Sequence, residues 1–297
     1  MCNRWHILGA GAIGTLWAAN LAAAGSSVTL LLRDQHRLDQ FKQIEGVLRD
    51  GELFPVDAEL TADSGSIQQL LITTKSTDTQ SAFNSIKNRL NPGAHIVVLQ
   101  NGMGSQQWVT DQSPDTEVAW ASTTDGAWIK SPFSVKHAGK GVTHIGSPTT
   151  HLKWLNNLQG GFLNVEIDRD IAGSLWRKLA INCAINPLTA VHHCKNGELI
   201  TTPKLMDEMT ALCAEVEAVA NALNIPLFEA PLIEQASQVA RLTAENYSSM
   251  LQDMKHGRTT EIDHITGYLC NLAAELGIKT PINGHYLSKI KKMQNRS

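Results

Sequence analysis

The chain has 297 residues, an apolar fraction of 42%, a charged fraction of 18% and a formal net charge of -3. This length predicts two domains of about 100–200 residues each, and the apolar content excludes a mainly disordered chain. Because the charge is nearly balanced and no basic block occurs, we expect no nucleic-acid partner. No run of about 18 consecutive apolar residues occurs, so we expect no membrane span and a cytoplasmic protein.

The first half of the chain alternates between strand-like and helix-like segments. A short strand at 5–8 precedes a glycine-rich turn and a helix over 13–24, which Gly25 ends. An amphipathic stretch near 78–90 separates two later apolar runs. This alternation predicts a mostly parallel sheet with helices on both faces. The further expected strands are 28–32, 70–74, 96–99 and 118–121.

The second half is expected to be helical. At about residue 168 the strand-like alternation ends, and apolar residues recur with the period of a helix. No internal repeat or low-complexity linker marks the change. The expected helices are 170–186, 203–223, 232–243 and 260–276, with a short one at the end.

The glycine-rich turn has the residues and the position that a dinucleotide-binding turn requires. Gly9, Gly11 and Gly14 form GxGxxG between a strand and a helix. In such turns the first glycine permits the tight bend, the second lets a pyrophosphate approach, and the third lets helix and strand pack closely. The motif alone is weak, but its place at the first strand–helix junction makes it specific. We expect the helix N-terminus and its turn to bind the cofactor through Gly9, Ala10, Gly11, Ala12, Ile13 and Gly14.

The end of the second strand predicts which dinucleotide binds. Arg33 follows that strand directly, and its planar donor fork matches the geometry of a 2′-phosphate. Lys75, after the next parallel strand, could add a second positive charge. These residues favour NADP, although Asp34 beside Arg33 is of the type that binds the ribose of NAD. The alternative is that both cations are solvated charges at strand ends.

A line of polar residues crosses an otherwise apolar helix. Lys178, Asn182 and Asn186 are spaced i, i+4 and i+8, so they share one helix face. The remaining surface is largely apolar, which indicates a buried helix. Burial lowers the pKa of a lysine, and such a lysine can donate a proton near neutral pH. The alternative is a lysine that reaches solvent beside two ordinary asparagines.

Glu261 is a second candidate for a role in chemistry. With Ile265 and Tyr268 at helical spacing, we place it on the apolar face of a helix. Thr260 and Asp263 resemble a capping box, so Glu261 is not needed to cap that helix. The alternative is an acidic residue that simply favours the first turn of a helix.

Two shorter motifs give opposite indications. Asn101 follows the strand at 96–99, at the carboxyl end of a sheet strand, where ligands of doubly wound folds bind; a plain Asn-Gly turn is the alternative. His192, His193 and Cys194 look like metal ligands, but adjacent side chains point apart and no second pair lies at ligand spacing. We therefore expect no metal.

Cysteine usage indicates neither a disulfide framework nor a zinc site. A disulfide framework has an even number of cysteines, and a zinc site has closely spaced pairs. Here the number is odd, no CxxC pair occurs, and no activating partner is adjacent, so we expect inert thiols. The cysteines are Cys2, Cys183, Cys194, Cys213 and Cys270.

Together these residues resemble the ketopantoate reductase (2-dehydropantoate 2-reductase) family, and the resemblance extends through nearly the whole chain. In the first half it rests on GAGAIG at 9–14, on the strand-end Arg33 and Lys75, and on QNGMG at 100–104. The blocks of the second half are far more specific than the glycine motif. They are LWRKLAINCAINPLTA at 175–190, KNGEL at 195–199, AENYSSMLQDM at 244–254 and TEID at 260–263.

The resemblance implies NADPH-dependent reduction of 2-dehydropantoate to (R)-pantoate in pantothenate and coenzyme A biosynthesis. It implies a Rossmann-type doubly wound parallel sheet as the NADP-binding domain over 1–168, followed by an all-α substrate and catalytic domain over 169–297. Lys178 matches the catalytic lysine that protonates or polarises the ketone oxygen. Glu261 matches the acid that orients the substrate and the nicotinamide ribose. The implied substrate-binding residues are Asn101, Lys178, Asn182, Asn186, Asn196, Asn246 and Ser249, and the implied cofactor contacts include Asn101, Ala127 and Glu261.

Two other functions stay open at this point. One is NADP-dependent reduction of another branched 2-keto acid at the same kind of site. The other is a non-catalytic dinucleotide-binding regulator, although such a protein would be free to lose Lys178 or Glu261 and both are present. Asp34 and the His192–His193 pair depart from the family's pattern, and the sequence does not predict an oligomeric state.

Overall fold

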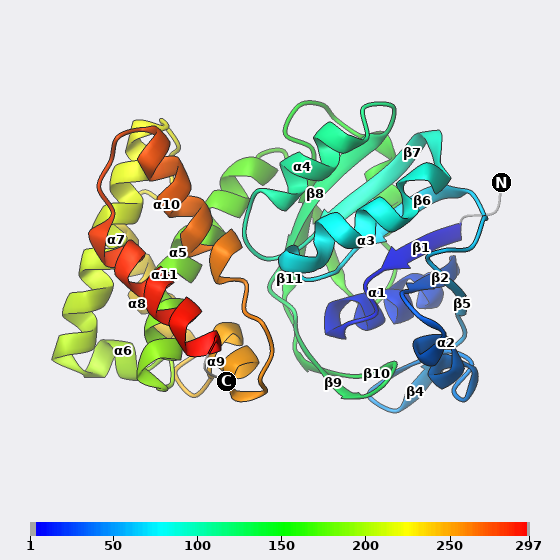
Figure 1. Cartoon of the computed structure of the whole chain (residues 1–297), viewed down its shortest axis with the longest axis horizontal. Helices are drawn as coiled ribbons and strands as arrows, with labels where there is room; N and C mark the ends of the chain where they lie inside the picture. Colours follow the sequence, from blue (N-terminus) through cyan, green and yellow to red (C-terminus); the bar gives the residue numbers. More distant parts are fainter. Residues whose placement is uncertain (1–3, 296–297) are drawn as a thin grey trace. The chain divides into compact units, whose positions relative to one another are not determined.

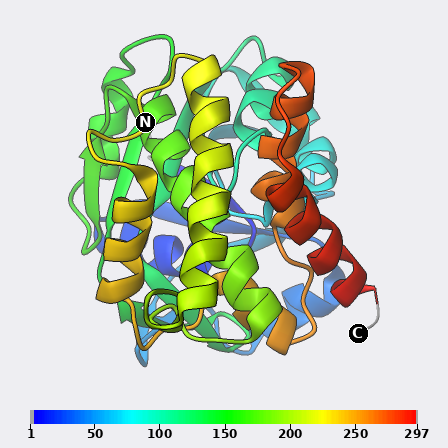
Figure 2. The same cartoon turned by 90° about the vertical axis from the view of Figure 1, so that its left-hand side faces the viewer.

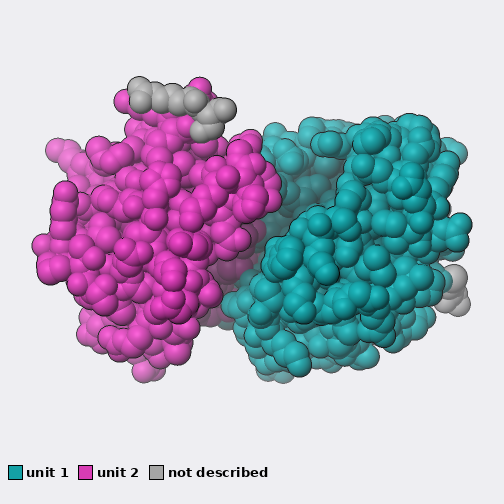
Figure 3. All heavy atoms as spheres, turned by 90° about the horizontal axis from the view of Figure 1, so that it is seen from below, with its two compact units in different colours: residues 1–100, 105–172 teal, residues 101–104, 173–297 magenta. Residues whose placement is uncertain are grey.

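The computed structural model describes residues 4–295, so Cys2 lies outside the described part (Figure 1). The chain forms two compact units, coloured separately in Figure 3. Unit 1 comprises the chain up to residue 100 together with 105–172, and unit 2 comprises 101–104 and the chain from 173 onward. The expected single boundary was at 168, whereas this division falls after 172 and gives a four-residue segment of the first half to unit 2.

Unit 1 is built on an eight-stranded sheet. Its strands are β1 (Arg4–Leu8), β2 (Ser27–Leu32), β5 (Asp57–Leu60), β6 (Ile67–Ile72), β7 (Leu90–Leu99), β8 (Glu117–Thr123), β11 (Val142–Gly146) and β12 (Asn164–Ile167). Their order is β12-β11-β8-β7-β6-β1-β2-β5. Every neighbouring pair is parallel except β8 and β11. The predicted fold class, a doubly wound parallel sheet followed by a helical half, is confirmed.

One row of side chains across this sheet shows why near-continuous apolar runs form its centre. Leu30 pairs with Ile7, which pairs with Leu71 on its other side, and the row continues through Val97 to Ala119. All five are fully buried. Parallel strands are covered on both faces, so both faces of such strands must be apolar.

Helix α1 (Ala12–Ala23) lies between this sheet and a second, smaller one. It contacts β1 and β2 as well as all four strands of the small sheet, and its residues from Gly14 to Leu21 are all buried. The other helices of unit 1 are α2 (Gln35–Lys42), α3 (Thr79–Ile86) and α4 (Ser105–Gln112) (Figure 1). Short 3₁₀ turns are η1 (Ser76–Asp78), η2 (Lys87–Arg89) and η3 (Lys153–Leu158).

The sequence patterns did not predict the small sheet. Its strands are β3 (Val47–Arg49), β4 (Glu52–Phe54), β9 (Gly126–Ser131) and β10 (Ser134–Gly139), in the order β4-β3-β10-β9. These strands are short, and β9 is largely exposed. β3 pairs with β10 across a long stretch of chain, so no local pattern signals the pairing.

All regular elements in the described part of unit 2 are helical (Figures 1 and 2). They are α5 (Ile171–His192), α6 (Glu198–Thr201), α7 (Pro203–Ala222), α8 (Leu232–Leu242), α9 (Ser249–Lys255), η4 (Ile262–His264), α10 (Thr266–Glu275) and α11 (Pro281–Gln294). Proline opens both α7 and α11, at the helix position where a missing N–H costs nothing. Among residues 4–295, no helix has the length and apolar character needed to cross a membrane.

Two expected helix boundaries were wrong. The helix expected to end at residue 186 continues through Pro187 to His192, because residues 183–191 are buried and this packing outweighs the hydrogen bond that a proline cannot make. The helix expected from residue 260 begins only at Thr266, since the backbone of Ile265 leaves helical geometry at φ -104° and ψ -89°. Glu261 therefore precedes the short turn η4 instead of lying on a helix face.

Candidate functional site

The glycine-rich turn is closely packed at its two ends and open in its middle. Gly9 has a φ of +112°, and a Cβ there would lie 2.5 Å from the backbone N of Thr74. A Cβ on Gly14 would lie 1.9 Å from the carbonyl oxygen of Gly9. A Cβ on Gly11 would meet no atom within 4 Å. The turn therefore leaves room for a ligand at Gly11, which fits a pyrophosphate at the N-terminus of α1.

Hydrogen bonds fasten this turn to the ends of two neighbouring strands. The Thr73 hydroxyl donates to the carbonyl of Gly9 at 2.7 Å. Gln100, which the sequence patterns did not single out, donates from Nε2 to the carbonyl of Thr74 at 2.8 Å. Lys75 comes directly after Thr74 and precedes η1. These hydrogen bonds link the carboxyl ends of β1, β6 and β7, next to the point where the chain continues from Thr74 to Lys75.

Asp34 has a structural task beside Arg33. Its carboxylate accepts a hydrogen bond from the backbone N of Arg37 at 2.8 Å and so caps α2. This bond, more than any other contact, lowers the pKa of Asp34. Arg33 Nε also lies 3.0 Å from the Asp34 carboxylate, while the Arg33 side chain is 85% exposed. Asp34 therefore has a structural role as the N-cap of α2.

Arg37 is a candidate cofactor residue that the sequence patterns missed. It is half-buried in the first turn of α2 and donates from Nη2 to the carbonyl of Ala10 at 3.4 Å. Its guanidinium lies over the ring of Phe133, 4.5 Å from the centroid. Burial, and then the charge of Arg33, lower its pKa. Arg37 thus contacts the glycine-rich turn and lies within electrostatic range of Arg33. The only available signal in the sequence was a second arginine four positions after Arg33.

The backbone around Ala127 is held by a buried contact between a histidine and a carboxylate. Ala127 on β9 pairs with His137 on β10. The Nε2 of His137 lies 2.9 Å from Oδ1 of Asp125, whose side chain is 2% exposed. Asp125 also accepts from the backbone N of Gly141 at 3.0 Å. Asp125 was not predicted as a site residue, and it fixes the turn that leads into Ala127.

In unit 2 the polar line on α5 contains a lysine with an altered pKa. Burial lowers the pKa of Lys178 to about 8, and the negative charge of Glu261 opposes this shift. Lys178, Asn182 and Glu261 are half-buried, while Asn186 is buried. A lysine in this environment is poised to give up a proton near neutral pH.

The segment 101–104 is attached to the turn that carries Glu261. The backbone N of Met103 donates to the carbonyl of His264 at 2.9 Å, and the backbone N of His264 donates to the carbonyl of Glu261 at 3.0 Å. Gly102 has a φ of +77°, and a Cβ there would lie 2.4 Å from the His264 carbonyl oxygen. Asn101 and Glu261, far apart in sequence, therefore belong to one local assembly.

The remaining predicted substrate residues are also brought together. The backbone N of Asn196 donates to the carbonyl of Asn246 at 3.0 Å, and Asn196 Nδ2 donates to the Thr243 hydroxyl at 2.9 Å. Ser248 caps α9, whose first residue is Ser249. Asn196, Asn246 and Ser249 therefore lie around one loop, residues 243–248. In this way the predicted cofactor residues of GAGAIG, Arg33, Lys75 and Ala127 lie in unit 1, and the predicted substrate residues lie in unit 2.

Of the histidine pair, His192 takes part in packing between helices and His193 is exposed. His192 Nε2 lies 3.1 Å from Oε2 of Glu208 and 3.2 Å from the hydroxyl of Tyr286. Tyr286 also donates to Glu208, and burial and this carboxylate raise the pKa of Tyr286. Over the described residues, no group of three or more histidine, cysteine or acidic side chains could hold a metal ion.

The buried thiols are poor nucleophiles. Burial raises the pKa of Cys213 to about 12 and raises that of Cys183 as well. The thiolate is the reactive form of cysteine, and at neutral pH these two side chains are almost entirely protonated.

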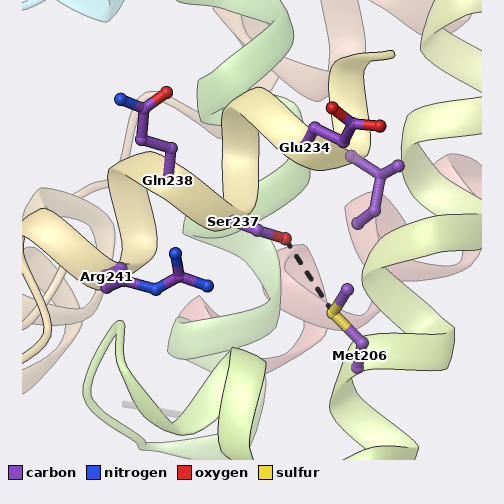
Figure 4. A pocket seen from close by; sticks show the side chains of 6 residues that line it. Met206, Glu234, Ser237, Gln238 and Arg241 are labelled. Atoms are coloured by element: carbon purple, nitrogen blue, oxygen red, sulfur yellow. Dashed lines mark hydrogen bonds between the residues drawn. The ribbon is translucent and has the colours of Figure 1, made fainter. Parts of the chain in front are cut away.

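A pocket of about 290 Å³ lies between α7 and α8 (Figure 4). In Figure 4 the hydroxyl of Ser237 points toward the sulfur of Met206, at 4.0 Å. None of the site residues predicted from the sequence lines this pocket. The lining residues are Met206, Ile233, Glu234, Ser237, Gln238 and Arg241.

The fold points to a class of protein, the dinucleotide-binding oxidoreductases with a Rossmann-type sheet followed by a helical half. Family comparison gives the particular family. The model described as ketopantoate reductase PanE/ApbA matches residues 5–149, and the model of its C-terminal part matches 170–294. This chain belongs to the ketopantoate reductase family, as the sequence blocks indicated.

Relatives and solved structures agree with this assignment. The 2-dehydropantoate 2-reductase of Vibrio cholerae is 36% identical over 97% of each chain. A crystal structure of a probable 2-dehydropantoate 2-reductase from Bacillus subtilis is 30% identical, with a TM-score of 0.85 over 98% of this chain and 99% of that one. D-mandelate dehydrogenase, solved with NADH and anilino(oxo)acetate, has a TM-score of 0.90 over 99% of each chain at 22% identity, which shows a shared fold.

Proposed function

We propose that this chain reduces 2-dehydropantoate to (R)-pantoate with NADPH and so serves pantothenate biosynthesis. The observation that carries the proposal is Lys178, whose pKa is lowered to about 8 on a helix face that it shares with Asn182 and Asn186. Membership of the ketopantoate reductase family, with 36% identity to a 2-dehydropantoate 2-reductase along nearly the whole chain, supports the choice of substrate.

The residues of unit 1 fit the proposed cofactor. The open space at Gly11 suits the pyrophosphate, and NADPH, when bound, supplies the hydride that reduces the ketone. Arg33 and Lys75 are proposed to bind the 2′-phosphate, and we add Arg37 on the basis of its place beside Ala10. Guanidinium groups match phosphate geometry with paired donors, so these side chains favour NADPH over NADH.

The residues of unit 2 supply proton transfer and orientation. The Lys178 ammonium is proposed to donate its proton to the ketone oxygen and to stabilise the negative charge that develops there. Glu261 keeps this ammonium protonated by opposing the loss of its proton. Asn182 and Asn186 would orient the substrate by hydrogen bonds. The amide and hydroxyl donors of Asn196, Asn246 and Ser249, together with Asn101, would hold its carboxylate and hydroxyl groups.

The test is a comparison of turnover with purified protein, followed through NADPH absorbance. Ketopantoate would be run with NADPH and with NADH, beside a second branched 2-keto acid and a 2-keto acid with a phenyl group. We expect rapid turnover with ketopantoate and NADPH only. If the protein prefers another keto acid, that compound would take the place of ketopantoate as the proposed substrate. Cofactor binding without turnover of any keto acid would instead support the regulator.

A further inference from the structure

Two buried hydroxyl groups join the helix that carries Lys178 to the loop that carries Asn246. The Oγ1 of Thr189, on α5, lies 2.7 Å from the Oγ of Ser248, which is 59 positions away in sequence. Thr189 is fully buried and Ser248 nearly so. Neither residue is among the groups proposed to touch substrate or cofactor.

The hydrogen-bond partners of these hydroxyls form a continuous chain. Ser248 Oγ accepts from the backbone N of Leu251 at 3.2 Å. Thr189 Oγ1 lies 3.1 Å from the carbonyl oxygens of both Ile185 and Asn186. Each hydroxyl has one proton and carbonyls only accept. The single Thr189 proton is donated to Ser248 Oγ, with the carbonyls of Ile185 and Asn186 as its other acceptors, so these contacts link the N-terminus of α9 to the α5 backbone at Ile185 and Asn186.

Both ends of this chain lie beside proposed substrate residues. At one end it reaches the backbone carbonyl of Asn186, one helical turn below Asn182 on α5. At the other end it holds the N-terminus of α9, where Ser249 follows the cap residue Ser248 directly. The loop 243–248 between Asn246 and this cap has one other long-range anchor among the described contacts of its backbone, the bonds from Asn196 and Gly197 to Asn246 and Ala244.

We propose that Thr189 is a positioning residue that sets the register between the α5 asparagines and the Asn246–Ser249 loop through Ser248. The proposal rests on the proposed function for its choice of substrate residues. Because Asn196 and Gly197 still anchor the loop when the hydroxyl chain is broken, the loop shifts without unfolding the unit. Groups that orient a substrate tolerate little displacement, and a shift of about 1 Å can reduce the rate by about a hundredfold.

The test compares Thr189→Val, which keeps the shape but removes the hydroxyl, with Thr189→Ser, which keeps the hydroxyl. Thr189→Val is expected to raise KM for ketopantoate about tenfold or more, and Thr189→Ser to restore it. NADPH affinity is expected to stay unchanged in both, because no residue proposed to contact the cofactor takes part in the Thr189–Ser248 bond. Thr210→Val is the matched control, since Thr210 makes the same type of bond to the carbonyl four residues earlier, 2.8 Å to Met206, and is exposed.

A double-variant cycle separates positioning from general loss of stability. Ser248→Ala is expected to raise KM as Thr189→Val does, and the combination of both to be no worse than either, because the two groups act as one chain. Hydrogen exchange of residues 243–255 is expected to be faster in Thr189→Val, a readout that needs no turnover. Unchanged exchange and an unchanged KM in Thr189→Val would overturn the proposal. If the wild-type protein does not reduce ketopantoate but Thr189→Val still exchanges faster, the proposed substrate is wrong and the positioning role of Thr189 stands.

Discussion

At Lys178 the proposed catalytic role and the stability of the fold make opposite demands on one side chain. Its pKa is about 8 in the folded chain and near 10.5 for a free lysine. Near pH 7 the folded chain therefore holds a partly desolvated ammonium, and this desolvation costs roughly 1–3 kcal/mol of stability. We expect Lys178→Met to abolish turnover, to leave NADPH affinity intact and to raise the free energy of unfolding by about that amount near pH 7. The gain is expected to shrink as the pH rises above 8 toward 10.5, because the wild-type lysine is then increasingly neutral. Denaturant unfolding at several pH values measures this, and equal stability of the two proteins near pH 7 would contradict it.

The charge of Glu261 is expected to set the alkaline limit of activity. Proton donation needs the protonated lysine, so kcat should fall as the pH rises through about 8, the pKa of Lys178. Because Glu261 opposes the lowering of this pKa, Glu261→Gln is expected to move the alkaline limb of the pH–rate profile to lower pH. Asp263→Asn is the control, since Asp263 is exposed and pairs with Lys291. If the alkaline limb does not move in Glu261→Gln, Glu261 does not influence the pKa of Lys178.

Arg33 and Arg37 are expected to act on the same part of the cofactor. Bonds between charged partners contribute about 1.5–3 kcal/mol, so Arg33→Ala and Arg37→Ala should each raise KM for NADPH about ten- to a hundredfold. The KM for NADH, which lacks the 2′-phosphate, should change little. Lys42→Ala serves as the control, because it removes a positive charge from the last turn of α2, the helix that carries Arg37 in its first turn. If KM rises equally for NADPH and NADH, the assignment of Arg33 and Arg37 to the 2′-phosphate is wrong.

At the scale of the element, Gly11 and Gly14 belong to one motif but are expected to serve different purposes, Gly11 in ligand binding and Gly14 in packing. A Cβ on Gly14 would lie 1.9 Å from a carbonyl oxygen, so Gly14→Ala must displace α1 from β1. We expect a loss of about 1–3 kcal/mol of stability or more, since this neighbour is backbone. Gly11→Ala meets open space and is expected to leave thermal unfolding unchanged while weakening NADPH binding. Thermal unfolding and cofactor titration of both variants test the distinction, and a strongly destabilised Gly11→Ala would refute it.

Elements with a strong local signal could be predicted, and elements that depend on distant partners could not. The central strands contain apolar runs such as 70–72 and 96–99, which burial on both faces requires. The strands of the small sheet have no such runs, since they are short and β9 is exposed. The start of α10 was misplaced because apolar periodicity continues through Ile265, while its backbone does not.

The same limit applies to the site. Lys178, Asn182 and Asn186 could be found because one helix spaces them regularly, and the glycine turn because its residues are adjacent. Their family roles came from the sequence blocks. The bond from Gln100 to Thr74 and that from Thr189 to Ser248 join residues 26 and 59 positions apart, and no spacing rule links such pairs in a sequence.

At the scale of the whole molecule, acid is expected to destabilise unit 1 through His6 and His95. Burial lowers the pKa of both below 6.5, so the folded unit prefers them neutral. The stability they contribute is present above pH 6.5 and is lost as the pH falls through their lower folded-state values, because the unfolded chain binds protons first. Replacing both by Gln should flatten the fall in unfolding free energy as the pH falls below about 6.5. An unchanged slope would assign the acid sensitivity to other groups.

The assignment of 101–104 to unit 2 has a consequence for inheritance and for protein engineering. The strand before this segment and the helix after it belong to unit 1, while Gly102 and Met103 fit against His264. A hybrid gene that joins the first 172 codons of one family member to the rest of another would set a loop from one parent against the η4 turn of the other. Recombination that keeps this loop with the helical half needs two extra crossovers, around codons 101 and 104. Within the family, we expect viable chimaeras to show that three-crossover pattern more often than a single exchange.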